Sequence, residues 1–238
     1  MKINVSLFLF FLSLFSLTHS FSAKAGPENQ PSEQQLLWSK ALLDAKMSIY
    51  KNRCDEAGQI LLALEGQRYP SKEERSLLIQ LLRMDLLYCS KNADSARSVF
   101  YALPVYEGND RLVHYEYLML QSKFLFDEFK IKESNQLLQK AFNLAHEMKD
   151  PVRKSLCANT IARNLTALDF YDDSFNYRKV ALKFANGDSL MLSVAYSGIA
   201  NYHYVHTHQY DSAIFYYSMA RKFSTADNRV FETTLLLN

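Results

Sequence analysis

Three histidines lie within six residues of one another, at His203, His206 and His208, and are the clearest candidates for metal chemistry in the sequence. Imidazole nitrogens bind zinc or copper, and on a helix His203 and His206 would share a face. His208, however, falls in a predicted turn before Asp211, and no acid or cysteine completes a recognised metal-binding spacing. We therefore interpret the three as polar residues that close a helix pair, and we predict no metal site.

Signatures of nucleophilic and phosphate chemistry are absent from the sequence. It contains no G-x-S-x-G, no H-E-x-x-H and no glycine-rich phosphate loop, and it has only 6 glycines in 238 residues. Because no set of residues can be assigned to a reaction, we predict no enzyme activity, no catalytic residue and no cofactor. A metal-dependent enzyme is the most distant alternative.

The helices that would position these side chains follow a repeated pattern. Helix-start signals recur every 38 to 40 residues, and the first two are capping boxes in which Ser is followed three residues later by Gln or Glu. The signals stand at Ser32, Ser71, Asp110, Asp150, Asp188 and Asp227. A recurrence of this length is typical of repeat proteins.

A second register lies in the middle of each period. A small residue recurs with the same spacing, at Ala57, Ala96, Ser134, Ser174 and Ala213. Each period therefore reads as helix, turn, helix and loop, with turns near Arg53, Asn92, Lys130, Phe170 and Gln209. The sequence predicts an all-α chain with repeats near 32–70, 71–109, 110–149, 150–187 and 188–226, and a partial sixth repeat at 227–238.

The N-terminal residues carry an export signal. Lys2 precedes an uncharged apolar run from Val5 to Leu17, which is the length of a signal-peptide core and too short to span a bilayer. Small residues allow cleavage after Ser22 or Ala25, and the second site has the A-x-A form. We predict a signal peptide at 1–25 and a short linker at 26–31; an uncleaved membrane anchor is the alternative.

The charge balance limits the partners. Cleavage after Ala25 removes Lys2 and Lys24, and leaves 25 of the 27 basic residues against 25 acidic ones. A neutral chain argues against nucleic acid or an anionic membrane as the main partner, because both favour a basic excess. No later apolar run reaches spanning length, so we predict no membrane span in the mature chain.

The three cysteines are too few and too scattered for a disulfide framework. They permit either one bond and one leftover thiol, or three buried thiols. Cys54 lies near a turn of the first unit and Cys89 near the end of a helix of the second, so stacked neighbours could bring them together. Cys157 is expected to be a buried free thiol.

The fifth and fourth units resemble the tetratricopeptide repeat (TPR) family. The fifth has Asn201-x-x-Tyr204 and Tyr210-x-x-Ala213-x-x-x-Tyr217-x-x-Ala220, and the fourth has Ala162-x-x-Leu165 and Tyr171-x-x-Ser174 leading to Ala181. The first three units match less well, and the period exceeds the usual 34 of the family. The resemblance implies an α-solenoid, right-handed and built of five helix pairs plus a partial sixth helix.

With its predicted export signal and its many aromatic residues, the chain resembles exported, periplasmic TPR proteins of Bacteroidota-type bacteria. The resemblance implies a binding groove for a protein or peptide ligand, in a scaffolding module without catalysis. The alternative is the periplasmic sensor portion of a membrane-bound signalling or transcriptional regulator, truncated before its membrane helix. The register itself points to truncation, because a sixth helix starts at Asp227 and the chain ends at Asn238; a short helix that caps the fifth unit is the other reading.

The resemblance places one groove residue per unit on the inner face of each first helix. These are Lys46, Asp85, Lys123, Arg163 and Tyr202, with Tyr50, Tyr88, Asp127, Asn159 and His206 as neighbours on the same face. Lys and Arg side chains would bind carboxylates and Tyr rings would supply rigid contact area. An ordinary solvated concave surface is the alternative.

Overall fold

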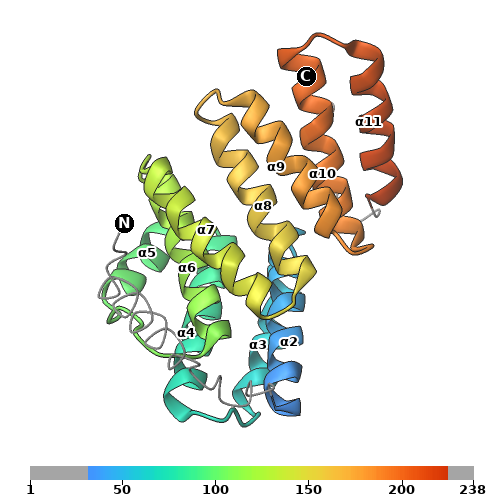
Figure 1. Cartoon of the computed structure of the whole chain (residues 1–238). Helices are drawn as coiled ribbons and strands as arrows, with labels where there is room; N and C mark the ends of the chain where they lie inside the picture. Colours follow the sequence, from blue (N-terminus) through green and yellow to red (C-terminus); the bar gives the residue numbers. More distant parts are fainter. Residues whose placement is uncertain (1–31, 225–238) are drawn as a thin grey trace, which may run out of the picture. The chain divides into compact units, whose positions relative to one another are not determined.

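The computed structural model describes residues 32–224, and every regular element in that range is helical (Figure 1). The elements form five helix pairs. They are α2 (Glu33–Tyr50) with α3 (Cys54–Glu65), α4 (Lys72–Cys89) with α5 (Ala93–Tyr101), α6 (Arg111–Asp127) with α7 (Ile131–Glu147), α8 (Pro151–Thr166) with α9 (Tyr171–Phe184), and α10 (Ser189–Asn201), extended by the π-helix η1 (Tyr202–His206), with α11 (Tyr210–Phe223). The prediction of an all-α chain without strands is confirmed for these residues.

The first helix of each pair begins where the sequence predicts, and in the second to fifth pairs an oxygen-bearing side chain caps it. Ser71 Oγ accepts a hydrogen bond from the amide of Glu74 at 3.2 Å. The carboxylates of Asp110, Asp150 and Asp188 accept amide hydrogen bonds of 2.8 to 3.1 Å from the first turns of α6, α8 and α10. These bonds satisfy donors that a helix start leaves unpaired.

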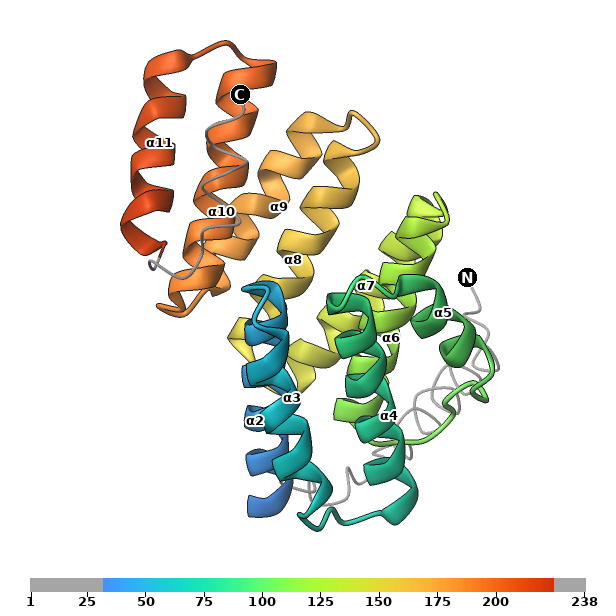
Figure 2. The ribbon, with the colours of Figure 1, turned by 180° about the vertical axis from the view of Figure 1, so that it is seen from behind.

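The turn inside each pair repeats as well. One residue in each turn has a positive φ between 55° and 61°, and these residues are again 38 to 40 apart: Asn52, Lys91, Phe129, Asp169 and His208. The five predicted turn residues follow directly and are the N-caps of α3, α5, α7, α9 and α11. A left-handed residue reverses the chain tightly, so each second helix runs back alongside the first, as α8–α9 and α10–α11 show in Figures 1 and 2.

The small residues of the second register are the contact points between paired helices. All five are buried, with at most 6% of their surface exposed: Ala57, Ala96, Ser134, Ser174 and Ala213. A small side chain lets two helix backbones approach closely, which is why the pattern marks a buried face. Ser134 and Ser174 also donate hydrogen bonds to carbonyls of the preceding helices, Ser122 and Ala162.

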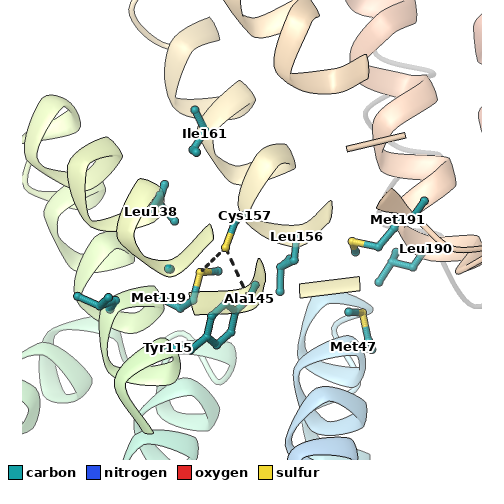
Figure 3. Packing of buried hydrophobic residues seen from close by; sticks show 13 residues of the cluster. Met47, Tyr115, Met119, Leu138, Ala145, Leu156, Cys157, Ile161, Leu190 and Met191 are labelled. Atoms are coloured by element: carbon teal, nitrogen blue, oxygen red, sulfur yellow. Dashed lines mark hydrogen bonds between the residues drawn. The ribbon is translucent and has the colours of Figure 1, made fainter. Parts of the chain in front are cut away.

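The first helix also meets elements far along the chain. Met47 of α2 belongs to the same buried cluster as Leu156 of α8 and Met191 of α10 (Figure 3). Arg153 of α8 donates hydrogen bonds to the hydroxyl and the carbonyl of Ser39 at 3.0 and 2.9 Å. The first helix pair therefore contacts the fourth pair directly.

Two predictions concern residues that lie outside the described range: the signal peptide and linker at 1–31, and the partial sixth repeat at 227–238. Across residues 32–224, no helix combines the length and the apolar character needed to cross a membrane. The disulfide that the sequence left open is present, with Cys54 and Cys89 Cα atoms 6.0 Å apart, and Cys157 is a buried free thiol.

Candidate functional site

Six of the ten predicted groove residues line one cavity of about 310 Å³. They come from the first helices of four successive pairs: Lys46 and Tyr50 of α2, Asp85 and Tyr88 of α4, Lys123 of α6 and Arg163 of α8. The rest of the lining is Ile49, Asn52, Cys89, Met119, Ser122 and Thr160. The resemblance to TPR proteins predicted these six positions, and the structure places them around one cavity.

The register explains why these side chains meet. Each of Lys46, Asp85, Lys123 and Arg163 stands six residues before the left-handed residue of its own pair. Equivalent positions in stacked helix pairs lie beside one another, so a single position brings four charged groups together.

An ion network with buried members includes three of the residues that line the cavity: Lys46, Asp85 and Lys123. Lys46 Nζ lies 2.8 Å from Asp85 and 2.9 Å from Glu116, and Lys123 Nζ lies 3.3 Å from the other oxygen of Asp85. Burial alone would lower the pKa of Lys46, but the two carboxylates outweigh it and raise that pKa. Burial likewise opposes ionisation of Asp85, yet Lys46 and Lys123 hold its pKa below the ordinary value.

The network continues behind the cavity through residues that the sequence analysis missed. Glu116 also contacts Arg153 at 3.3 Å, and Arg153 contacts Asp150 at 2.7 Å. Glu116 and Arg153 are 3% and 1% exposed, which is unusual for charged residues unless they are paired. The one available signal was a glutamate within an otherwise apolar run of α6, from Leu112 to Leu120.

Two further cations line the cavity: Arg163, which is exposed, and Lys123, which shares Asp85 with Lys46. Arg163 lies over the ring of Phe126 at 4.4 Å and bonds to Asn164, and within residues 32–224 no carboxylate is at ion-pair distance from it. Lys123 lies over the ring of Tyr88 at 3.7 Å. Burial lowers the pKa of Lys123, Asp85 opposes that effect, and the charges of Lys46 and Arg163 add to it. A bound anion would relieve this repulsion.

The other four predicted groove residues lie outside the cavity lining. Asp127 accepts a hydrogen bond from Tyr88 at 3.1 Å and so supports its rim. Burial, followed by that hydrogen bond, raises the pKa of Tyr88 to about 12. Asn159 accepts a hydrogen bond from Arg178 at 3.0 Å. Tyr202 and His206 pack elsewhere, against α9.

Tyr202 and His206 belong to an aromatic cluster at the last described pair. The ring of Tyr202 stacks on Phe175 with centroids 4.3 Å apart, and His206 stacks on Tyr171 at 5.0 Å. Both also approach Asp172, which accepts a hydrogen bond from the Tyr202 hydroxyl at 2.6 Å. These side chains join the fourth and fifth pairs rather than line the cavity.

The structure does not bring His203, His206 and His208 together as metal ligands. His203 and His206 lie in η1, where the helix widens to π geometry, and His208 is the left-handed residue of the following turn. Within the described part of the chain, no group of three His, Cys, Asp or Glu side chains is placed to hold a metal ion. Nothing in the local sequence indicated the π-helix.

In comparisons with known proteins, no protein-family model, no curated protein and no solved structure matches the chain. The resemblance to TPR proteins therefore stays a prediction. What the chain binds has to be argued from the cavity, its charges and the helices that enclose it.

Proposed function

We propose that this protein is an exported, TPR-like binding module that holds a protein or peptide through one anionic group, and that it catalyses no reaction. The observation that carries the proposal is Arg163, an exposed cation that lines a cavity built from four successive helix pairs and that has no carboxylate at ion-pair distance within residues 32–224. A cation held in a concave site without a carboxylate partner is a candidate for ligand binding.

A peptide carboxylate fits the chemistry of the lining. The guanidinium of Arg163 and the ammonium of Lys123 are donors only, and charge-assisted hydrogen bonds to a carboxylate are the strongest that such groups make. The hydroxyls of Ser122 and Thr160 line the same cavity, as do the rings of Tyr50 and Tyr88. The rings would supply rigid apolar area beside the charged group.

The closure between α2 and α8 favours the end of a chain over an extended segment. Arg153 and Ser39 join these helices behind the cavity, and a volume of about 310 Å³ is at the small end of ligand sites. An α-carboxylate with one or two side chains fits such a space. The repeated register of helix starts and turns supports the solenoid architecture that such a module would use.

The test compares two pools of acetylated pentapeptides of random sequence, one with free α-carboxylates and one with amidated ends, passed over the immobilised protein. We expect retention of the carboxylate pool and little retention of the amide pool. Replacement Arg163→Gln should weaken carboxylate retention by about tenfold or more, which corresponds to about 1.4 kcal/mol.

The matched control is Lys140→Gln, which removes one positive charge from the exposed face of α7, away from the cavity lining. It should leave retention unchanged, so that a loss in Arg163→Gln reports the site and not the net charge. Equal retention of the two pools, or an equal loss in both variants, would show that the cavity does not bind a chain end.

A further inference from the structure

Within residues 32–224, three of the four junctions between consecutive helix pairs have a side-chain contact at one recurring position; the fourth pair has Ala167 there. Two residues before the left-handed residue, the first helix of a pair carries a side chain that meets the second helix of the preceding pair. The contacts are the disulfide Cys89–Cys54, the ion pair Asp127–Arg97 at 3.9 Å and the ring stack His206–Tyr171 at 5.0 Å. The position of the contact in the repeat is thus the same in these pairs, while the kind of contact differs, and one of the contacts is covalent.

The covalent joint lies at the cavity. Cys89 is part of the lining, as are Tyr88 beside it and Asn52, which precedes Cys54 by two residues. The disulfide therefore ties the turn after α2 to the end of α4 at the cavity wall. One helical turn earlier on α4, Asp85 makes the ion pair with Lys46 that links α4 to α2.

We propose that the Cys54–Cys89 disulfide is a redox-sensitive latch on the anion-binding cavity, and that its reduction by a dithiol lowers the affinity for the ligand. The latch rests on the function proposed above. In the reaction a dithiol gives two electrons and two protons, its own sulfurs join as a disulfide, and the sulfur–sulfur bond between Cys54 and Cys89 becomes two thiols.

The physical reason is loss of preorganisation. With the bond intact, Asn52 and Tyr88 are held on the same wall, and a ligand need not order that wall on binding. After reduction, the ion pair of Lys46 with Asp85 still joins α2 to α4, but the turn after α2 is free to move away from the end of α4. The site then binds only in the fraction of molecules in which the wall is in place.

The third cysteine does not interfere with this chemistry. Cys157 is fully buried, and its sulfur lies 3.7 Å from the hydroxyl of Tyr115 and 3.6 Å from the sulfur of Met119 (Figure 3). Burial raises the pKa of this thiol to about 12, so it carries almost no thiolate at neutral pH. Exchange is therefore confined to the pair at the cavity, both members of which are half-buried.

The experiment measures retention of the carboxylate pentapeptide pool by three forms of the protein. These are the oxidised protein, the protein reduced with dithiothreitol and capped with iodoacetamide, and the variant Cys54→Ser with Cys89→Ser, which carries no added cap. We expect the second and third forms to retain the pool at least about fivefold less well than the first. Cys157→Ala is the control, because it keeps the disulfide and should bind like the oxidised protein.

Hydrogen exchange of the same samples separates the latch from the binding proposal. Faster exchange at residues 46–52 and 85–92 in the reduced form, with α10 and α11 unchanged, supports the latch. This holds even if no form of the protein retains the pool, since the lack of retention would refute only the anion-binding function. Equal retention by oxidised and reduced protein overturns the latch and leaves the binding function intact. Loss of the whole helical circular dichroism signal on reduction also overturns it, because the bond would then hold the fold and not the cavity.

Discussion

The first three helix pairs and the last two are joined by different chemistry. Among the first three pairs the contacts include buried ion pairs, with Asp85 of α4 shared by Lys46 of α2 and Lys123 of α6, and the disulfide between α3 and α4. Rings also meet there, as Phe100 and Tyr117 do at 4.9 Å. Between α9, η1 and α11 the contacts are ring stacks, with Phe175 on Tyr202 and His203 on Tyr216 at 5.4 Å. Both regions use the same positions of the repeat, since Tyr202 is the register equivalent of Lys123.

The difference shows that the repeat fixes where side chains meet and leaves the kind of contact open. Ion pairs in a buried site are directional and respond to pH, and breaking one leaves an unpaired charge. Ring stacks are apolar contacts with little dependence on pH or salt. The region of the cavity is therefore expected to respond to charge, and the aromatic region to loss of packed area.

The largest effect is expected at Arg153, which holds Glu116, Asp150 and Ser39 together. Replacement Arg153→Met should lower the free energy of unfolding by about 3–5 kcal/mol, because it leaves Glu116 buried with one partner fewer. Urea denaturation followed by circular dichroism gives the value. The control, Arg111→Met, breaks a half-exposed ion pair with Glu147 and should cost less than about 1 kcal/mol.

A large loss in Arg111→Met as well, or a small one in Arg153→Met, would contradict the view that buried charge holds the first helix in place. Adding Glu116→Leu to Arg153→Met should restore part of the lost stability, since a buried pair replaced by apolar residues leaves no unpaired charge on that side.

Acid should loosen the cavity region before the aromatic region, with a smaller effect than Arg153→Met because fewer contacts are lost. The pKa of Asp85 lies below the ordinary 3.8, so its stabilising contribution is present above that pH and is lost as pH falls through the folded value. Hydrogen exchange between pH 6 and pH 2 should show α2 and α4 losing protection earlier than α10 and α11. In Asp85→Asn this difference between the regions should shrink; an unchanged difference would argue against Asp85 as its cause.

The aromatic region should lose a modest amount of stability when one ring is removed. Phe175→Ala deletes the partner of Tyr202 and should cost about 1 kcal/mol beyond the lost apolar area, equally in low and high salt. Tyr202→Phe keeps the ring and loses only the hydrogen bond to Asp172, and should cost less. A strong salt dependence of the Phe175→Ala loss would show that charge also holds this region.

The smallest effect concerns a turn between paired helices. Phe129 has φ of 60° and is 90% exposed, so its ring contributes little while its backbone is in a region that bulky residues avoid. Phe129→Asn should raise the free energy of unfolding by about 0.5–1 kcal/mol, because Asn tolerates the left-handed conformation. Phe170→Asn is the control, since Phe170 is half-exposed with φ of −82° and should show no gain. A similar gain in both would assign the effect to the exposed ring.

The sequence by itself determined the positions of the helices. Their starts depend on capping side chains such as Asp110 and Asp150, which bond to amides two or three residues away, and the turns recur because each pair reverses at an equivalent residue. These are local interactions, so local patterns were enough to place them. The resemblance to TPR proteins, carried over position by position, also predicted six of the residues that line the cavity.

Only the tertiary structure decided how those residues act. Whether Lys46 faces solvent or a carboxylate depends on contacts between positions about 39 and 70 residues apart, with Asp85 and Glu116. The enclosure depends on Arg153 reaching Ser39, 114 residues earlier in the chain. Such contacts form only when several helix pairs have packed, and the burial that makes a charge or a disulfide important at the cavity is a property of that packing.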